Sequence, residues 1–369
     1  LTLCITNGKM KAVQTMTDLE KLCSRVTEAA NCAVITDDVN RRYFTAMKSS
    51  AGTLVVFPEK AYFIIDFRYI EKAKKTVTAC EVILQDKLYE QINSLIEKHG
   101  AKTVSVNVDT CTLSELIAYQ QKLNAEVIAD TKLAEIIREI RTVKSQEQID
   151  KIIKAQRIAE KGFAHMLDFI KVGRTEKEIQ LELDYYMLKN GAEALSFDTI
   201  ALSGSNTSLP HGVPSDKKVE SGEFVLMDFG ATYDGWHSDM TRTVCVGKPS
   251  DKMESVYETV LTAQLSALDA VKAGMSGKAL DKIARDIITE AGYGDNFGHS
   301  LGHGVGVEIH ESPYASPSRE DILPENSIVT VEPGIYLEGK FGVRIEDFVV
   351  VTENGCINMT KAPKELICL

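Results

Sequence analysis

Two carboxylates lie eleven residues apart in a segment whose pattern predicts a β-hairpin. Asp228 ends an apolar run within residues 222–244, and Asp239 lies in the second half of the same segment. The Asp234-Gly235 dipeptide between them is typical of a tight hairpin turn, so we expect one acid on each of two paired strands. A carboxylate among apolar residues is costly unless something positive meets it. The segment alone is equally consistent with two turn aspartates that accept backbone hydrogen bonds.

The second half of the chain contains an internal repeat. Residues 171–179 resemble residues 272–280, and the helix-capping Thr175 and Ser276 are separated by the same 101 residues as the glycines around them. Each copy therefore predicts the start of a helix. We expect two similar α–β halves around a pseudo-twofold axis, with acidic strand ends at the centre.

The repeat extends to the carboxylates. Residues 224–230 resemble residues 328–334, because each has an apolar strand followed by an acid, one further residue and a glycine. The acids at equivalent places are Asp228 and Glu332, followed by Asp239 and Glu346.

A histidine-rich segment, residues 298–313, lies between the two pairs of acids. It holds three of the seven histidines, and its glycines allow close approach of the backbone to other groups. Alone, this composition is typical of a flexible loop. Four buried acids that converged without counter-charge, however, would repel one another strongly.

Divalent cations would resolve this repulsion. Four carboxylates and the imidazole of His303 suit two ions with bridging acids. The oxygen-rich set favours Mn²⁺ first, with Co²⁺, Fe²⁺ or Zn²⁺ possible, over a thiolate-type structural zinc site. Two ions about 3.5–4 Å apart can share a hydroxide and hold a carbonyl oxygen, so we predict metal-assisted hydrolysis.

Composition limits the other classes of function. A chain of 369 residues is too long for one ordinary core, so two domains are expected. No apolar run approaches the roughly 20 residues that span a bilayer. The net charge of −11 argues against nucleic acid and anionic membrane as partners. The scattered cysteines are typical of reduced thiols in a cytoplasmic protein, and residues 1–8 lack the basic flank of a signal peptide.

We predict an α/β domain in residues 1–141 and a second domain in residues 142–369. The first alternates strand and helix patterns and has no glycine-rich phosphate loop, so nucleotide binding is not expected. The second begins near a capping box at residues 145–148. The strands predicted in the first domain start at Ala33, Thr53, Tyr62, Val82 and Val104, and its helices cover residues 17–29, 88–99, 112–123 and 131–140.

The order of the candidate ligands resembles that of the pita-bread metallopeptidases, and within them the Xaa-Pro peptidases, aminopeptidase P and prolidase. The resemblance covers the whole chain, since this family also carries an N-terminal α/β domain, of which residues 66–69 resemble a part. It implies an α+β pita-bread catalytic domain with a pseudo-twofold repeat. The five matching metal positions are Asp228, Asp239, His303, Glu332 in Val-Glu-Pro-Gly and Glu346 in Arg-Ile-Glu-Asp.

The resemblance also implies a role for each metal position. Asp228 would hold one ion, His303 and Glu332 would hold the other, and Asp239 and Glu346 would bridge them. Glu332 would also accept a proton from the attacking water.

Four further residues match substrate-binding positions of the family. His310 and His211 match histidines that bind substrate and stabilise the tetrahedral intermediate, and imidazole can donate to an oxyanion near neutral pH. His211 is also consistent with a plain turn between two prolines. His299 matches a further active-site histidine of aminopeptidase P. Arg344 would orient Glu346 or meet the substrate.

The implied activity is removal of an N-terminal residue that precedes proline in a peptide. We favour aminopeptidase P, with prolidase as the alternative, and the resemblance implies a homodimer. Methionine aminopeptidase is disfavoured because that activity would not account for the N-terminal domain. A non-catalytic pita-bread binding protein, or a metal-free hydrolase similar to creatinase, would not keep the five ligands. Arg242 is expected to be structural and to pair with a nearby acid.

Overall fold

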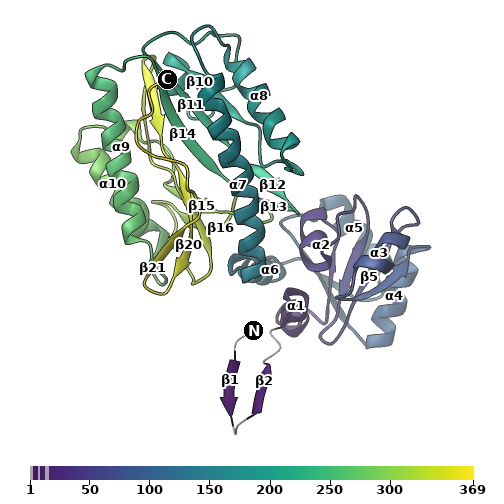
Figure 1. Ribbon diagram of the computed structural model, residues 1–369. Coiled ribbons are helices and arrows are strands. Elements are labelled where there is room, and N and C mark those ends of the chain that lie inside the picture. Colours follow the sequence, from purple (N-terminus) through teal and green to yellow (C-terminus); the bar gives the residue numbers. More distant parts are fainter. Residues whose placement is uncertain (1–2, 7–8, 13–15) are drawn as a thin grey trace. The chain divides into compact units, whose positions relative to one another are not determined.

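The computed structural model describes residues 3–6, 9–12 and 16–369 (Figure 1). The prediction that residues 1–8 are not a signal peptide concerns residues that lie partly outside this range. The chain divides into two compact units, Leu1–Ile140 and Arg141–Leu369. In the part of the chain that is described, no helix combines the length and the apolar character needed to cross a membrane.

The first unit contains a mixed sheet of strand order β6-β5-β4-β3-β7-β8. Its central strands are fully buried, since helices cover the apolar side chains on both faces. The elements of this unit are β1 (Leu3–Thr6), β2 (Lys9–Ala12), α1 (Asp18–Arg25), η1 (Val26–Glu28), β3 (Cys32–Ile35), α2 (Asp38–Thr45), β4 (Thr53–Val56), β5 (Ala61–Ile65), α3 (Ile70–Thr76), β6 (Glu81–Leu84), α4 (Leu88–His99), β7 (Thr103–Val106), α5 (Leu113–Lys122), β8 (Glu126–Ile128) and α6 (Lys132–Thr142).

The second unit places helices on both sides of short antiparallel sheets. Figure 1 shows α7 and α8 on one side of the strands and α9 and α10 on the other. Its elements are α7 (Gln146–Phe169), α8 (Glu176–Lys189), β9 (Ala194–Leu195), β10 (Ile200–Ser203), η2 (Gly204–Ser208), β11 (Glu223–Phe229), β12 (Ala231–Tyr233), β13 (Trp236–His237), β14 (Met240–Val246), α9 (Asp251–Ala270), α10 (Gly277–Glu290), η3 (Gly294–Asn296), β15 (Gly302–Gly304), β16 (Glu311–Ala315), β17 (Ile328–Val331), β18 (Gly334–Leu337), β19 (Phe341–Arg344), β20 (Asp347–Thr352) and β21 (Gly355–Asn358).

The internal repeat is confirmed. Helices α8 and α10 both begin and end 101 residues apart. Thr175 and Ser276 are their N-caps, and each also bridges to a later segment, at Lys218 and Ile322 respectively. The first half then forms the sheet β10-β11-β14, and the second half pairs β17 with β20. The duplicated elements therefore bring equivalent strand ends together.

The two caps give a test of this repeat. The Thr175 hydroxyl accepts a hydrogen bond of 3.0 Å from Glu178 N, and the Ser276 hydroxyl accepts one of 3.2 Å from Ala279 N. Replacing either residue by alanine should lower the free energy of unfolding by about 1 kcal/mol, whereas Thr175→Ser should retain most of it. Urea unfolding followed by the fluorescence of Trp236, the single tryptophan, reports on this unit. An alanine variant as stable as the wild type would contradict the capping role.

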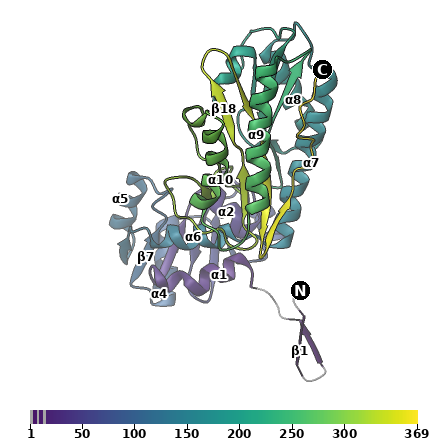
Figure 2. The ribbon, with the colours of Figure 1, turned by 90° about the vertical axis from the view of Figure 1, so that its left-hand side faces the viewer.

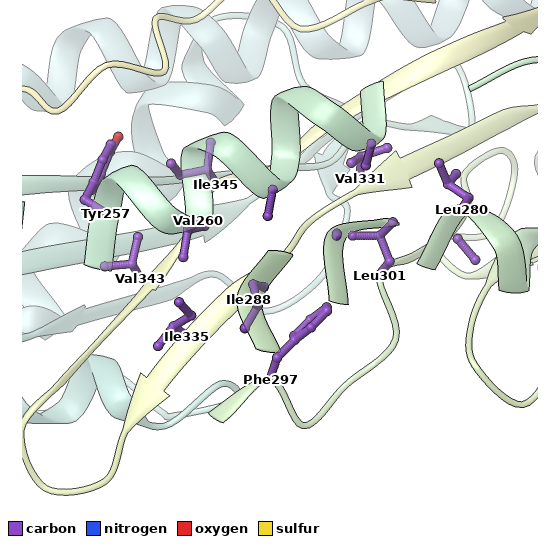
Figure 3. Packing of buried hydrophobic residues seen from close by; sticks show 14 of the residues in the cluster. Tyr257, Val260, Leu280, Ile288, Phe297, Leu301, Val331, Ile335, Val343 and Ile345 are labelled. Carbon is purple, nitrogen blue, oxygen red and sulfur yellow. The ribbon is translucent and has the colours of Figure 1, made fainter. Parts of the chain in front are cut away.

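A large apolar cluster supports the strands of the second half. Helices α9 and α10 pack against each other, α9 also lies on β17, β18 and β19, and α10 lies on β16 (Figure 2). Figure 3 shows side chains from both helices and from the strands meeting in this cluster, with Val260 and Ile288 among those from the helices. Burying an aliphatic side chain of this size contributes about 1.5–3 kcal/mol, so the strands that carry the second pair of acids are firmly held.

The predicted hairpin is present but is broken at one point. The turn has positive φ at both Asp234 (49°) and Gly235 (81°), as this type of turn requires. β11 pairs with β14, but Ser238 and Asp239 fall between β13 and β14, and the Cα partner of Asp228 is Thr241. A Cβ atom at Gly230 would lie 2.0 Å from Ser238 O, so the chains cross closely at this kink. The kink places Asp239 at a strand end rather than within a strand.

Candidate metal centre

The ends of strands from both halves converge on the candidate ligands. Asp228 lies near the end of β11, and Asp239 directly precedes β14. Glu332 directly follows β17 and Glu346 directly precedes β20, while His303 lies in β15. The fold therefore brings together all five side chains that the sequence assigned to metal, from segments more than 100 residues apart.

The distances within this cluster suit a cation. His303 Nε2 lies 3.6 Å from Asp239 Oδ2 and 3.3 Å from Glu332 Oε1. Donor atoms of Asp239, His303 and Glu346 all lie within 4.8 Å of one another. A cation placed among them could therefore bind oxygen and nitrogen donors together.

The orientation of His303 is fixed by its surroundings. Its Nδ1 lies 3.1 Å from Gly304 O, and because a carbonyl only accepts, the Nδ1–H group donates. Nε2 is thus the nitrogen directed at the acids, as in many metal-binding histidines. β15 approaches β17 so closely that a Cβ atom at Gly302 would lie 2.0 Å from Thr330 O, which confirms the close backbone approach predicted for these glycines.

Two buried carboxylate oxygens are suited to bind a cation. Asp228 Oδ1 and Glu346 Oε1 are buried and have no hydrogen-bond partner among the described residues. Burial and the neighbouring acids raise the pKa of Asp239 and Glu346 well above the usual values, and burial also raises the pKa of Asp228. Both observations describe negative charge that lacks compensation, and a divalent ion would supply it.

Glu332 and His303 form a pair within the cluster. Burial alone would raise the pKa of Glu332, but the hydrogen bond and charge of His303 outweigh it and lower this pKa to about 2. Burial alone would lower the pKa of His303, but the hydrogen bond and charge of the Glu332 carboxylate outweigh this effect and raise it to about 9. The imidazole would have to lose its proton when a cation binds.

Arg344 contacts Asp228 rather than Glu346. Its Nη2 donates to Asp228 Oδ2 at 2.5 Å, and its Nη1 donates to the Tyr336 hydroxyl at 2.7 Å. Its Nε donates to Thr241 Oγ1 at 3.0 Å, and this hydroxyl donates to Glu346 Oε2 at 2.7 Å. Of the two roles expected for Arg344, the geometry favours orientation of the ligands, directly for Asp228 and through Thr241 for Glu346.

Both ring nitrogens of His299 are engaged. Nδ1 lies 2.8 Å from Ser300 O and therefore donates, while Nε2 lies 2.9 Å from the Tyr336 hydroxyl. Burial lowers the pKa of His299, which agrees with a neutral ring that accepts from Tyr336. His299 faces the cavity, but its polar atoms contact the protein in this arrangement.

A cavity of about 490 Å³ opens beside these residues. His211 and His310 both line it, so the structure gathers all nine predicted site residues at one place. The ring centroids of His303 and His310 lie 4.3 Å apart, and burial lowers the pKa of His310. The apolar part of the wall consists of Phe197, Ile200, Pro210, Ile309 and Tyr314.

Sequence reasoning missed Thr241 and Tyr336. Both accept a hydrogen bond from the guanidinium of Arg344. Neither belongs to a spacing pattern that indicates a functional site. The repeat could have drawn attention to Thr241, since it lies two residues after a candidate ligand on a strand that was already predicted.

A cavity lined by acids and histidines, built on a duplicated α–β domain, defines a metallopeptidase of pita-bread architecture. Residues 150–353 match metallopeptidase family M24, and residues 20–143 match the creatinase/prolidase N-terminal domain. This chain belongs to metallopeptidase family M24 and is a metallo-exopeptidase.

Three similar proteins illustrate the match. The chain is 39% identical to a Xaa-Pro dipeptidase of Pyrococcus furiosus over 95% of this chain and 99% of that protein. A solved Xaa-Pro dipeptidase from Bacillus anthracis has a TM-score of 0.92 at 41% identity, covering 95% of this chain and 99% of the other. A solved X-Pro aminopeptidase from Thermotoga maritima has a TM-score of 0.87 at 38% identity, with the same coverage. The resemblance to Xaa-Pro peptidases and the predicted fold class are confirmed.

Proposed function

We propose that this protein is a Xaa-Pro dipeptidase that uses two divalent ions, with Mn²⁺ as the first choice. The observation that carries the proposal is the buried cluster of four acids and one histidine with two unpartnered carboxylate oxygens. By the family resemblance, Asp228 would hold one ion, His303 and Glu332 would hold the other, and Asp239 and Glu346 would be shared by both. Bound ions would supply a nucleophilic hydroxide and polarise the scissile carbonyl.

The surrounding residues divide the remaining work. Glu332 would accept the proton of the attacking water and pass it to the prolyl nitrogen, as a carboxylate within the metal centre can. His310 is neutral near pH 7 because burial lowers its pKa, and a neutral imidazole can still donate one hydrogen bond to the developing oxyanion. His211 lines the same cavity and contacts the substrate. His299 and Arg344 hold their neighbours in place.

Dipeptidase activity is supported by the relatives. The Pyrococcus furiosus protein and the Bacillus anthracis structure are both named Xaa-Pro dipeptidase, and each matches nearly its whole length. This support is stronger than that for aminopeptidase P, which the sequence alone favoured.

Aminopeptidase activity is the second candidate, because one feature of the cavity favours it. A dipeptide substrate ends in a carboxylate beside the proline, which a site usually meets with a cation. Arg344 is the one permanently charged cation that lines the described cavity, and its guanidinium already contacts Asp228, Tyr336 and Thr241. The Thermotoga maritima X-Pro aminopeptidase is also a close structural match. A longer peptide places no carboxylate at this point.

Hydrolysis of a Xaa-Pro dipeptide and a Xaa-Pro-Xaa tripeptide, each with Mn²⁺ and with chelator, tests both candidates. We expect metal-dependent cleavage of the dipeptide. Cleavage of the tripeptide alone would make the protein an aminopeptidase. Equal activity after exhaustive chelation, or a protein that binds no Mn²⁺, would contradict the metal centre itself.

The proposal includes a cytoplasmic homodimer. The family resemblance supports the dimer. The cysteines described in residues 16–369 are all free thiols, which suits a reducing compartment. Light scattering coupled to gel filtration measures the assembly directly, and a monomeric mass would contradict the dimer.

A further inference from the structure

A second cluster of charged side chains lies next to the metal centre but outside the candidate ligands. It consists of Arg141, Lys144, Glu308 and Glu311. The side chain of Lys144 is 0% exposed, and those of Arg141 and Glu311 are 6% and 7% exposed. Charged groups buried to this degree are costly unless they are paired with good geometry. Charged residues that served only to keep the protein soluble would lie on the surface, so the burial of these three side chains indicates another role.

Glu311 is bound by a separate cation at each oxygen. Lys144 Nζ donates to Glu311 Oε1 at 2.6 Å, and Arg141 Nη2 donates to Oε2 at 2.7 Å. The same Arg141 nitrogen also donates to Glu308 Oε2 at 2.5 Å. Burial would raise the pKa of Glu311, but the two cations outweigh it and lower this pKa, so the carboxylate stays ionised.

The carboxylate lies at the loop end of the β15–β16 hairpin, beside two site histidines. Glu311 begins β16 and pairs with Gly304 of β15. Its chain neighbour is His310, and the chain neighbour of Gly304 is His303. His310 lines the cavity in the bend that leads directly into Glu311, so holding Glu311 in place limits where the chain can put His310.

The loop of this hairpin fits tightly around the carboxylate. A Cβ atom at Gly306 would lie 2.1 Å from Glu311 Oε1, so only glycine leaves room for the side chain. Glu308 N also lies 3.4 Å from Glu311 Oε2. Lys144 is anchored in turn, because its backbone N–H donates to Asn326 O at 2.9 Å. The cluster thus joins the start of the second unit to the loop of the hairpin and to its second arm, β16.

We propose that Glu311, held by Arg141 and Lys144, is a positioning residue that sets His303 and His310 for catalysis. The inference rests on the proposed function, since it requires the metal centre. The β15–β16 pairing is short, with only two pairs of Cα partners. The charged hydrogen bonds from Arg141 and Lys144 to Glu311 are directional and fix the register of this pairing. Groups that orient metal ligands typically change metal affinity about 10–100-fold when they are removed.

Replacing Glu311 by glutamine in the full chain tests the proposal. The dissociation constant for Mn²⁺, measured by titration calorimetry, should rise by about 10–100-fold. With saturating Mn²⁺, kcat should fall at least about tenfold, because the histidines would be displaced rather than removed. The factor by which kcat falls should exceed the factor by which KM rises. The fluorescence of Trp236 shows whether the variant remains folded.

Two further variants keep the test decisive. Lys144→Met leaves Arg141 on Glu311 and should weaken Mn²⁺ binding by about threefold to tenfold, so it decides the question if the glutamine variant does not fold. The matched control is Glu223→Gln, which breaks a pair with Lys217 (2.7 Å) in the same unit away from the cavity, and its Mn²⁺ affinity should not change.

The outcomes separate this inference from the proposed function. If folded Glu311→Gln and Lys144→Met proteins bind Mn²⁺ and turn over peptide within twofold of the wild type, the positioning role is wrong and the proposed function stands. If the wild-type protein itself binds no Mn²⁺, the proposed function is wrong.

Discussion

Replacing Glu346 by glutamine is expected to remove divalent-ion binding at one position and to stabilise the metal-free protein. Glu346 Oε1 is buried without a partner, and Oε2 accepts a hydrogen bond from Thr241. Burial and the nearby Asp239 raise its pKa well above the usual value, which means that the charged form is disfavoured in the absence of metal. An amide of the same shape removes that charge, so the metal-free protein should gain about 0.5–2 kcal/mol of stability.

The same substitution should lower kcat/KM by roughly three orders of magnitude, or about 4 kcal/mol of transition-state stabilisation. Metal content after dialysis against Mn²⁺ and thermal unfolding after chelation measure the two effects separately. Glu338→Gln is the matched control, because Glu338 is an exposed glutamate of the same unit and should change neither quantity. A Glu346→Gln protein that keeps two ions per chain would contradict the bridging role. A metal-free variant less stable than the metal-free wild type would contradict the uncompensated charge.

Glu346→Gln is thus expected to weaken metal binding and activity but to stabilise the metal-free protein, and these opposite effects are typical of a functional site. The fold holds four acids in an arrangement that is unfavourable without metal, and the apolar packing of α9 and α10 on the strands supplies the stability that this requires. A functional site is where a sequence is expected to conflict with its own local stability.

The sequence predicted the features that depend on local chemistry. The caps at Thr175 and Ser276, the turn at Asp234-Gly235 and the apolar strands ending in acids each have a local signal, so the repeat and the gathering of the acids followed from them. Helices α2 and α3 and strand β8 were missed because each is too short to show a periodic pattern.

The features that depend on long-range contacts could not be predicted. Arg344 is two residues from Glu346 in the chain, yet its guanidinium contacts Asp228, 116 residues away. The break in the hairpin at Gly230 moves Asp239 out of the pair with Asp228, and only the folded backbone shows why. Glu311 carried no signal in the sequence, because its partners lie about 170 residues earlier.

Replacing Arg242 by methionine is expected to lower the free energy of unfolding of the second unit by roughly 3–5 kcal/mol. The prediction that Arg242 pairs with a nearby acid is confirmed, since its Nη2 donates to Asp347 Oδ1 at 2.7 Å with both side chains almost fully buried. The guanidinium also donates to four backbone carbonyl oxygens, and methionine would remove all four hydrogen bonds, although one of these oxygens would keep the Glu346 N–H group as a donor. These oxygens belong to Thr241, Glu346, Ala362 and Pro363.

The effect should extend to the metal centre because one of these carbonyls belongs to Glu346. Loss of that hydrogen bond frees the backbone of a candidate bridging ligand, so Mn²⁺ affinity should fall along with stability. Arg242→Lys separates charge from geometry, since an ammonium keeps the charge opposite Asp347 but cannot reach five acceptors in fixed directions. We expect its stability to lie between that of the wild type and Arg242→Met, measured by urea unfolding with Trp236 fluorescence. If lysine restored full stability, charge alone would explain the role of Arg242, and if methionine cost less than about 1 kcal/mol, this network would not hold the strand that presents Glu346.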